Sequence, residues 1–461
     1  MGSHVQRIAT VGRRLAVVGV TAVLVVTGCS ESSTKDTAAA TTAKPGGPTL
    51  LPGQIPAQAG DGTSIVSRFA GAKWFGGTVP SKPKKADASL TPVKVGVMSA
   101  DSGAVAALPE LHQGMKGAIS FINDELGGVG GHPVQEVFCE VDLSPEKSQL
   151  CARKMAEEKV VAVLSGVDLA AGDAIKVLNE NGIPWVGGIP IGDEEMKSPN
   201  TFQFSGGTPG AFVAMADDMT TNLKAKKVSV MYLNIPQVKN AAVDYGAALL
   251  KKRGVAVTEV GFDLTTQDFA AVAQKAAEGN PDAIVAGAAD SACPKVLQAL
   301  SDLQSKAKVY MVGSCADKKW LDQIGVDKAA GTVFNIENRF DQTEPLADTE
   351  IYTEALARYQ PATSPRGAAT VSFRGTMNLW AVLNKIGASA TPAQVVAAFK
   401  AAKNAPSFDG HAYTCDGKQI PSMPGLCAPQ EVLIRLKPDG NFEEASKGWI
   451  DVPKIVADNN L

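Results

Sequence analysis

Short apolar runs alternate with segments of helical periodicity along the chain from Val93 onward. The run 93–98 predicts a buried strand, and the apolar residues that recur between Leu111 and Ile122 predict one face of a helix. Ser144 followed by Pro145 is typical of an N-cap with a proline in the first turn, so we expect another helix to begin there.

The alternation falls into two series, separated near residue 227. The first contains predicted strands at 93–98, 134–138, 160–164, 183–186 and 201–204. The second contains predicted strands at 228–233, 255–261, 283–286 and 309–312, with a further strand at 332–336 where the chain would cross between lobes. Strands that alternate with helices form parallel sheets covered on both faces. We therefore predict an α/β fold with two doubly wound parallel-sheet lobes. Ligands bind beyond the carboxyl ends of such strands, which predicts a cleft between the lobes.

The N-terminus is typical of an export signal. Three arginines precede a short apolar stretch, 15–26, which is too short to cross a bilayer of about 30 Å as a helix. It ends in VTGC at Cys29, which resembles a bacterial lipoprotein box. That resemblance implies a signal peptide at 1–28 and lipidation of Cys29, hence an extracytoplasmic protein anchored to the cell membrane. An ordinary secretory signal and an uncleaved anchor are the alternatives.

Composition changes after the lipoprotein box. Residues 30–63 are mostly Ser, Thr, Ala, Pro, Gly and Gln, so we expect a flexible tether over 29–90. Phe69, Trp74 and Phe75 leave open whether part of 64–90 docks on the body.

Six cysteines remain besides Cys29, and an even number in an exported chain indicates disulfides. Fifteen connectivities are possible. The cysteines form three local couples, so we expect sequential pairing: Cys139 with Cys151, Cys293 with Cys315, and Cys415 with Cys427. None has C-x-x-C spacing and the histidines are scattered, so we expect no metal site.

The remaining composition excludes several function classes. The formal net charge of the 461 residues is −3, so no positive field would attract nucleic acid. The G-x-S-x-G elbow, the G-K-[ST] phosphate loop and the H-E-x-x-H motif are all missing. We expect neither an enzyme nor a cofactor.

Several segments together resemble the branched-chain amino-acid-binding proteins, which are type I solute-binding proteins of ABC importers. They are VKVGVMSADSG at 93–103, GVGGHP at 128–133, VVAVLSG at 160–166, NGIP at 181–184 and the stretch 268–284. The resemblance implies a monomer that delivers a solute to an ABC permease, and a three-segment hinge near 207–211, 336–340 and 410–430. The lobes would be 91–208 plus 338–410 and 209–337 plus 411–461.

In that family, hydroxyl groups and backbone amides hold the amino-acid carboxylate, and an acidic residue in the second lobe holds the ammonium. The corresponding positions here are Leu169 and Ala170 at the first hydroxyl site, Ile191 at the second, Ser314 at the acidic site with Asp317 three residues later, and Leu108 where relatives place an aromatic. Burying an unpaired carboxylate or ammonium costs several kcal/mol, so this pattern disfavours an α-amino acid.

We therefore expect a small, partly apolar organic solute against an edge that includes Leu108, Leu169, Ile189 and Ile191. The candidates to orient it are Ser102, Gln237, Asp290, Ser291, Ser314 and Phe373 with Arg374. Arg374 would either pair a ligand carboxylate or be an exposed surface residue. A branched-chain or other amino acid is the alternative ligand, and a sensor acting on a signalling partner is the alternative role.

Overall fold

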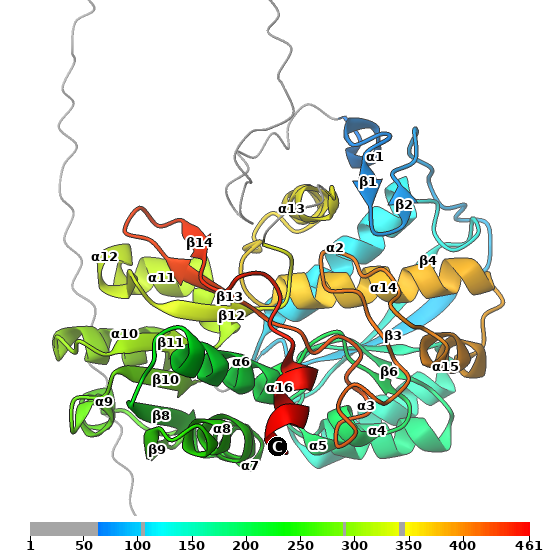
Figure 1. Cartoon of the computed structure of the whole chain (residues 1–461). Coiled ribbons are helices and arrows are strands. Elements are labelled where there is room, and N and C mark those ends of the chain that lie inside the picture. Colours follow the sequence, from blue (N-terminus) through cyan, green and yellow to red (C-terminus); the bar gives the residue numbers. More distant parts are fainter. Residues whose placement is uncertain (1–62, 103–106, 289–291, 341–345) are drawn as a thin grey trace, which may run out of the picture. The chain divides into compact units, whose positions relative to one another are not determined.

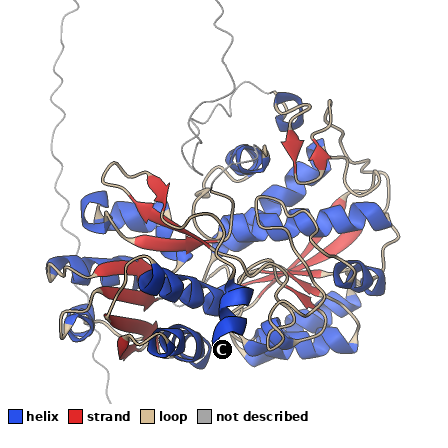
Figure 2. Cartoon of the chain, in the orientation of Figure 1, coloured by secondary structure: helices blue, strands red, loops and turns tan. Residues whose placement is uncertain are grey.

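The computed structural model describes residues 63–102, 107–288, 292–340 and 346–461, all within one compact unit, Thr49–Leu461. These residues form two α/β lobes (Figure 1; Figure 2). The predicted signal peptide and Cys29 lie outside the described residues, and so do Asp290 and Ser291.

Lobe 1 is built on a five-stranded sheet, ordered β4-β3-β5-β6-β7, in which all neighbours are parallel. Its strands are β3 (Val93–Ser99), β4 (Val134–Glu140), β5 (Val163–Ser165), β6 (Trp185–Val186) and β7 (Thr201–Phe202). Its helices are α2 (Pro109–Glu125), α3 (Pro145–Glu157), α4 (Ala171–Glu180), α5 (Asp193–Lys197), α13 (Asp348–Tyr359), α14 (Ala369–Ile386) and α15 (Pro392–Lys400). The predicted alternation of strands and helices in the first series is confirmed.

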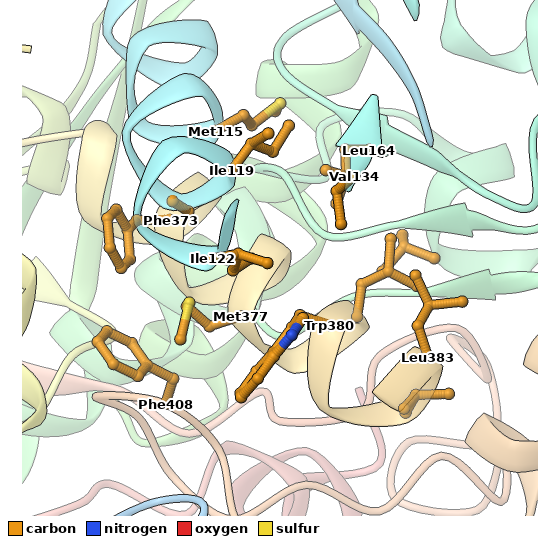
Figure 3. Close-up of a cluster of buried hydrophobic side chains, with 14 of the residues drawn as sticks. Met115, Ile119, Ile122, Val134, Leu164, Phe373, Met377, Trp380, Leu383 and Phe408 are labelled. Carbon is orange, nitrogen blue, oxygen red and sulfur yellow. The ribbon is translucent and has the colours of Figure 1, made fainter. Parts of the chain in front are cut away.

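Both faces of the lobe 1 sheet are buried, as expected of a parallel sheet. Val95 and Val97 of β3 pack into the core with α2, α13 and α14, whereas Met98 packs with α3 and α4. Gly96 allows α3 to approach closely, because a Cβ there would lie 2.6 Å from Sδ of Met155. Figure 3 shows the larger core, in which Met115, Ile119 and Ile122 of α2 cluster with side chains of α14 and of the sheet, among them Met377, Trp380, Val134 and Leu164.

Lobe 2 contains a seven-stranded sheet, ordered β14-β13-β12-β11-β10-β8-β9. Its strands are β8 (Lys227–Leu233), β9 (Ala256–Phe262), β10 (Ala283–Gly287), β11 (Lys308–Met311), β12 (Val333–Ile336), β13 (Val432–Leu436) and β14 (Phe442–Glu444). Its helices are α6 (Gly207–Thr221), α7 (Pro236–Asn240), the π-helix η1 (Ala241–Ala247), α8 (Ala248–Lys252), α9 (Phe269–Ala277), α10 (Cys293–Asp302), the 3-10 helix η3 (Gly313–Ala316), α11 (Lys318–Ile324), α12 (Val326–Ala329) and α16 (Val452–Asn459). Strands β8 to β12 are parallel, whereas β13 and β14 are antiparallel additions that the alternation did not predict.

The residues of β8 alternate between two cores. Val228 and Val230 pack with α6, η1 and α8, whereas Met231 and Leu233 pack with α9 and α10. Helix α9 begins where the side chain of Asp268 accepts hydrogen bonds from the first-turn amides. Ser144 caps α3 in the same way, which confirms the helix start predicted there.

The N-terminal segment 63–90 differs from the prediction of a tether reaching residue 90. It contains α1 (Ile65–Arg68) and the short strands β1 (Lys73–Trp74) and β2 (Gly77–Thr78). Trp74 and Phe75 are buried in the lobe 1 core, and the Phe75 amide donates to Asp348 at 3.1 Å. The prediction was wrong over this stretch because three aromatic side chains in a polar segment bury enough surface to fold onto the body.

The six cysteines form the three sequential disulfides, so the predicted pairing is confirmed. Cys139–Cys151 joins β4 to α3, and Cys293–Cys315 joins α10 to η3. Each disulfide therefore closes a local loop within the body. The described residues that line the cleft between the lobes include none of these six cysteines.

The chain passes between the lobes three times. The first passage follows Phe204 and enters α6, the second leads from β12 to α13, and the third spans roughly 410–431. Backbone bridges join Gln203 to Leu426 and Asn338 to Gly410, so the passages lie against one another. Assigning everything after 410 to lobe 2 is wrong in detail, because Tyr413 and both cysteines of the third disulfide pack in the lobe 1 core.

Candidate functional site

A cavity of about 190 Å³ lies between the two lobes. It opens at the carboxyl ends of the parallel strands, where doubly wound sheets bind ligands. Its apolar lining residues are Leu108, Val167, Leu169, Ile189, Ile191, Ala211, Leu233, Ile235, Val238, Ala288, Val312, Ala316, Ile336, Phe340, Pro365, Ala368, Val371, Ile434 and Phe442. Its polar lining side chains among the described residues are Thr208, Ser314, Asn335, Glu337, Asn338, Arg366 and Thr370.

Strand ends supply most of the walls. In lobe 1, Leu169 follows β5 and the pair Ile189 and Ile191 follows β6; in lobe 2, Ile235 follows β8 and Val312 follows β11. Gly207 brings the two sides together at the start of α6. Its φ is +59°, and a Cβ there would lie 2.3 Å from the carbonyl oxygen of Pro190. The cleft is therefore a product of the sheet topology, and its walls are mostly aliphatic.

The floor of the cleft, at the hinge, contains a buried network of charged and polar groups. Arg374 of α14 is 1% exposed and donates to Glu337, at 2.9 Å to Oε2 and also to its carbonyl oxygen. Ser205 donates to the other carboxylate oxygen of Glu337. Ser205 belongs to the first passage, Glu337 to the second, and Arg374 to α14 of lobe 1. The hydrogen bonds to Glu337 therefore join two hinge passages to lobe 1.

A second buried carboxylate lies next to this network. Glu431 is fully buried in the third passage and accepts a hydrogen bond from Asn335 at 3.0 Å. Burial raises the pKa of Glu431 well above its usual value, and the nearby charge of Glu337 raises it further. With one guanidinium and two carboxyl groups, the hinge favours a protonated Glu431.

Arg366 is a cationic residue on the cleft lining, and it also faces protein groups. Its guanidinium carbon lies 5.2 Å from the centre of the Phe442 ring, in lobe 2. Asp317, also in lobe 2, attracts it electrostatically. The turn at Gly367 packs against Asp317, since a Cβ there would lie 3.0 Å from its carboxylate oxygen.

The structure brings five of the predicted site residues to the cleft: Leu108, Leu169, Ile189, Ile191 and Ser314. Gln237 lies at its edge, where the amide donates to the carbonyl oxygen of Leu169 at 3.4 Å. Ala170 and Asp317 lie immediately behind it, at the N-caps of α4 and α11. Neither of them is among the lining residues.

Three expectations were wrong. Ser102 is exposed and donates to Glu140, away from the lining. Phe373 is fully buried in the lobe 1 core, with its ring centre 5.4 Å from that of Phe408 (Figure 3). Arg374 is not a surface residue, because it is buried and pairs with Glu337 in the interior. Burial decided the outcome for Phe373 and Arg374, and burial depends on tertiary packing.

Sequence reasoning missed several lining residues. Val167 and Ile235 follow predicted strands by a few positions, and the strand-end rule would have found them. Ile434 and Phe442 come from β13 and β14. No helix separates these two strands, so the alternation of strands and helices did not predict them. Glu337 had no local signal, since its role depends on Arg374 far along the chain.

Within 63–461, leaving aside the three short undescribed gaps, no group of His, Cys, Asp and Glu is arranged to hold a metal ion. In the same part of the chain, no helix has the length and apolarity needed to cross a membrane.

Comparison with solved structures shows the fold. One match is the branched-chain amino-acid transporter substrate-binding protein LivJ from Streptococcus pneumoniae in complex with isoleucine, at 15% identity and a TM-score of 0.64, covering 78% of this chain and 99% of that one. A leucine-binding protein, LivK from Thermotoga maritima, matches at 18% identity and a TM-score of 0.63, covering 77% and 98%. A fatty acid ABC transporter substrate-binding protein from Thermomonospora curvata matches at 14% identity and a TM-score of 0.66, covering 81% and 96%.

No curated protein sequence matches the chain. The family model described as periplasmic binding protein matches residues 92–424, which is most of the chain. The described lobes have the type I form of that fold. The protein is thus an extracytoplasmic solute-binding protein and not an enzyme. The chain belongs to the periplasmic binding protein family.

Proposed function

We propose that this protein is the lipid-anchored receptor of an ABC importer, and that its cleft takes a small, largely apolar organic solute. The observation that carries the proposal is the character of the walls. Aliphatic side chains from both lobes face the cavity, and few polar groups interrupt them. Pockets of this kind gain affinity from apolar burial and use the few polar groups for orientation.

The charges near the cavity argue against an α-amino acid. A zwitterion needs a partner for its carboxylate and another for its ammonium group. On the described walls the charged residues are Glu337 and Arg366. Glu337 is paired with Arg374, and Arg366 faces Asp317 and the Phe442 ring. Binding a zwitterion would therefore require these contacts to break, at a cost of several kcal/mol.

Branched-chain amino acids remain the alternative ligand, because two of the similar structures are named for leucine or a branched-chain transporter. The similar structure from Thermomonospora curvata is named for fatty acids, which are apolar solutes. The same two-lobed fold thus occurs with both ligand classes. The aliphatic walls of this chain favour the second class.

Cys29 supports a role in transport. A diacylglycerol on this residue would hold the receptor at the membrane, where a permease collects its solute. The polar stretch after Cys29 would let the body stand off the membrane surface. The alternative is a sensor that signals to a partner protein, for which the same body would serve.

Native mass spectrometry of the purified full chain, followed by thermal shift against a metabolite panel, tests the ligand class. A solute that binds only the folded state stabilises it by RT ln(1 + [L]/Kd), so a true ligand gives a graded concentration response. We expect that response from apolar solutes. Strong stabilisation by leucine, isoleucine and valine at micromolar concentrations would overturn the proposed ligand class.

A Cys29→Ala variant tests the anchor separately. Without the thiol there is no site for the diacylglycerol, so we expect the protein to move from the membrane fraction to the soluble extracytoplasmic fraction. A Ser32→Ala variant is the matched control, because it changes a nearby side chain and leaves the Cys29 thiol in place, so it should remain with the membrane. An unchanged distribution of Cys29→Ala would contradict lipidation at this residue.

A further inference from the structure

An ion pair joins the two lobes at the edge of the cleft. Glu110 lies in the first turn of α2 in lobe 1, and Lys319 lies in the first turn of α11 in lobe 2. Oε1 of Glu110 contacts Nζ of Lys319. Each residue closely follows a residue that lines the cavity, Leu108 and Ala316 respectively. The pair therefore spans the cleft next to its walls without lining it.

The carboxylate of this pair is buried, and its counter-charge comes from the other lobe. The side chain of Glu110 is 10% exposed and that of Lys319 is 42% exposed. The second carboxylate oxygen of Glu110 has no hydrogen-bond partner among the described residues. Nζ of Lys319 also lies 4.6 Å from the centre of the Trp320 ring. A carboxylate that is nearly dry and singly paired depends strongly on the cation that faces it.

We propose that Glu110 and Lys319 are positioning residues that hold the cleft closed. In an opened cleft the two side chains separate and both return to water, so their attraction acts only while the lobes are together. A contact that exists in one of two states biases the equilibrium toward that state. The pair then lengthens the time for which a solute stays enclosed, without contacting the solute. This inference rests on the proposed binding function only in requiring a cleft that opens and closes.

Hydrogen exchange of the full chain without any added solute tests the proposal. The peptides to follow cover the walls at 187–191 and 233–238. Lys319→Met leaves the Glu110 carboxylate buried without a counter-charge in the closed form, so we expect these peptides to exchange about tenfold faster. Glu110→Gln removes the charge that needs compensation, and a smaller rise of about threefold is expected.

The double variant gives the sharpest result. In Glu110→Gln/Lys319→Met no charge is left uncompensated, so its wall peptides should exchange more slowly than those of Lys319→Met. Lys318→Met is the matched control, because Lys318 pairs with Asp322 within α11 and both side chains are exposed. It should exchange as the wild type does. Unchanged exchange of the β10 peptide, 283–287, would show that lobe 2 remains folded in every variant.

Two results would overturn the proposal that Glu110 and Lys319 hold the cleft closed. Wall peptides of Lys319→Met that exchange at the wild-type rate would show that the pair does not bias closure. A double variant whose exchange equals the product of the two single effects would show that the residues act independently. Because no solute is added, failure of the proposed ligand class would leave this experiment unaffected.

Discussion

The walls of the cleft and the hinge beneath them are built from opposite kinds of residues. The walls are mostly aliphatic, and many of their residues follow the ends of parallel strands in both lobes. The hinge holds Ser205, Glu337, Arg374 and Glu431, all buried and hydrogen-bonded within the protein. The difference teaches that buried charge near a binding cleft need not serve the ligand. In this protein the buried groups bond to one another across the hinge passages, and selection of the solute is the role proposed for the walls.

Removing a hinge charge should have the largest effect. Arg374→Met leaves the Glu337 carboxylate buried without its cation, so we expect the free energy of unfolding to fall by about 3–5 kcal/mol. Urea denaturation measures it. Arg374→Met/Glu337→Gln should recover part of the loss, since the orphaned charge is gone. An unchanged stability in Arg374→Met would mean that Arg374 is free to serve a ligand.

Placing a charge in the wall of the cleft should leave the fold intact and strongly weaken solute binding. Ile191→Asp puts a carboxylate among aliphatic side chains that cannot pair with it, so affinity for the identified solute should fall about 100-fold or more. Isothermal titration calorimetry measures the change. Ile191→Val is the matched control and should bind within a few-fold of the wild type. Equal binding by the Asp variant would place the solute elsewhere.

A buried charge in lobe 1 that does not line the cleft should affect stability in a pH-dependent way. His112 lies between Asp101 and Glu136 in lobe 1. Burial of the ring lowers its pKa, but the hydrogen bonds to both carboxylates outweigh this and raise the pKa of His112 to about 9. Between pH 6.5 and 9 the folded chain therefore binds more protons than the unfolded chain. The stability from the protonated ring is fully present below pH 6.5 and is lost as the pH rises through about 9.

Comparing wild type with His112→Gln isolates this contribution, because the other buried carboxyl groups titrate in both proteins. We expect the wild type to lose about 1–2 kcal/mol more than the variant between about pH 6 and pH 9.5, after allowing for solvent near the carboxylates. Denaturation at the two pH values measures the difference. Parallel losses in the two proteins would show that His112 is not held protonated.

The smallest effect is expected at the rim. Gln237→Ala removes the hydrogen bond to the carbonyl oxygen of Leu169, so affinity should fall about threefold with the order of preferred solutes unchanged. Gln237→Met keeps the approximate size of the side chain and removes its donor without adding a charge, so it should behave alike. A changed order of solute preference would show that Gln237 contacts the ligand and does more than join the two lobes at the rim.

The sequence predicted those features that depend on local pattern. Strand–helix alternation predicted both lobes and a cleft at the strand ends, and the resemblance to the branched-chain amino-acid-binding proteins pointed to Leu169, Ile189 and Ile191, which line it. Features that depend on long-range packing were not predictable in this way. Neither interpretation of Arg374 anticipated its ion pair with Glu337. Phe373 was predicted to contact the ligand, but its ring lies in the lobe 1 core. The burial of Trp74 likewise depends on residues of α14, including Trp380.

Selection of an apolar solute over a zwitterion is the central property proposed for the cleft. Calorimetric titration with three compounds of equal carbon skeleton tests this directly: L-leucine, 4-methylpentanoic acid, which lacks the ammonium group, and the neutral 4-methylpentanamide. We predict that affinity rises as charge is removed, with leucine the weakest of the three. Micromolar binding of leucine that is lost when its ammonium group is removed would contradict an apolar cleft.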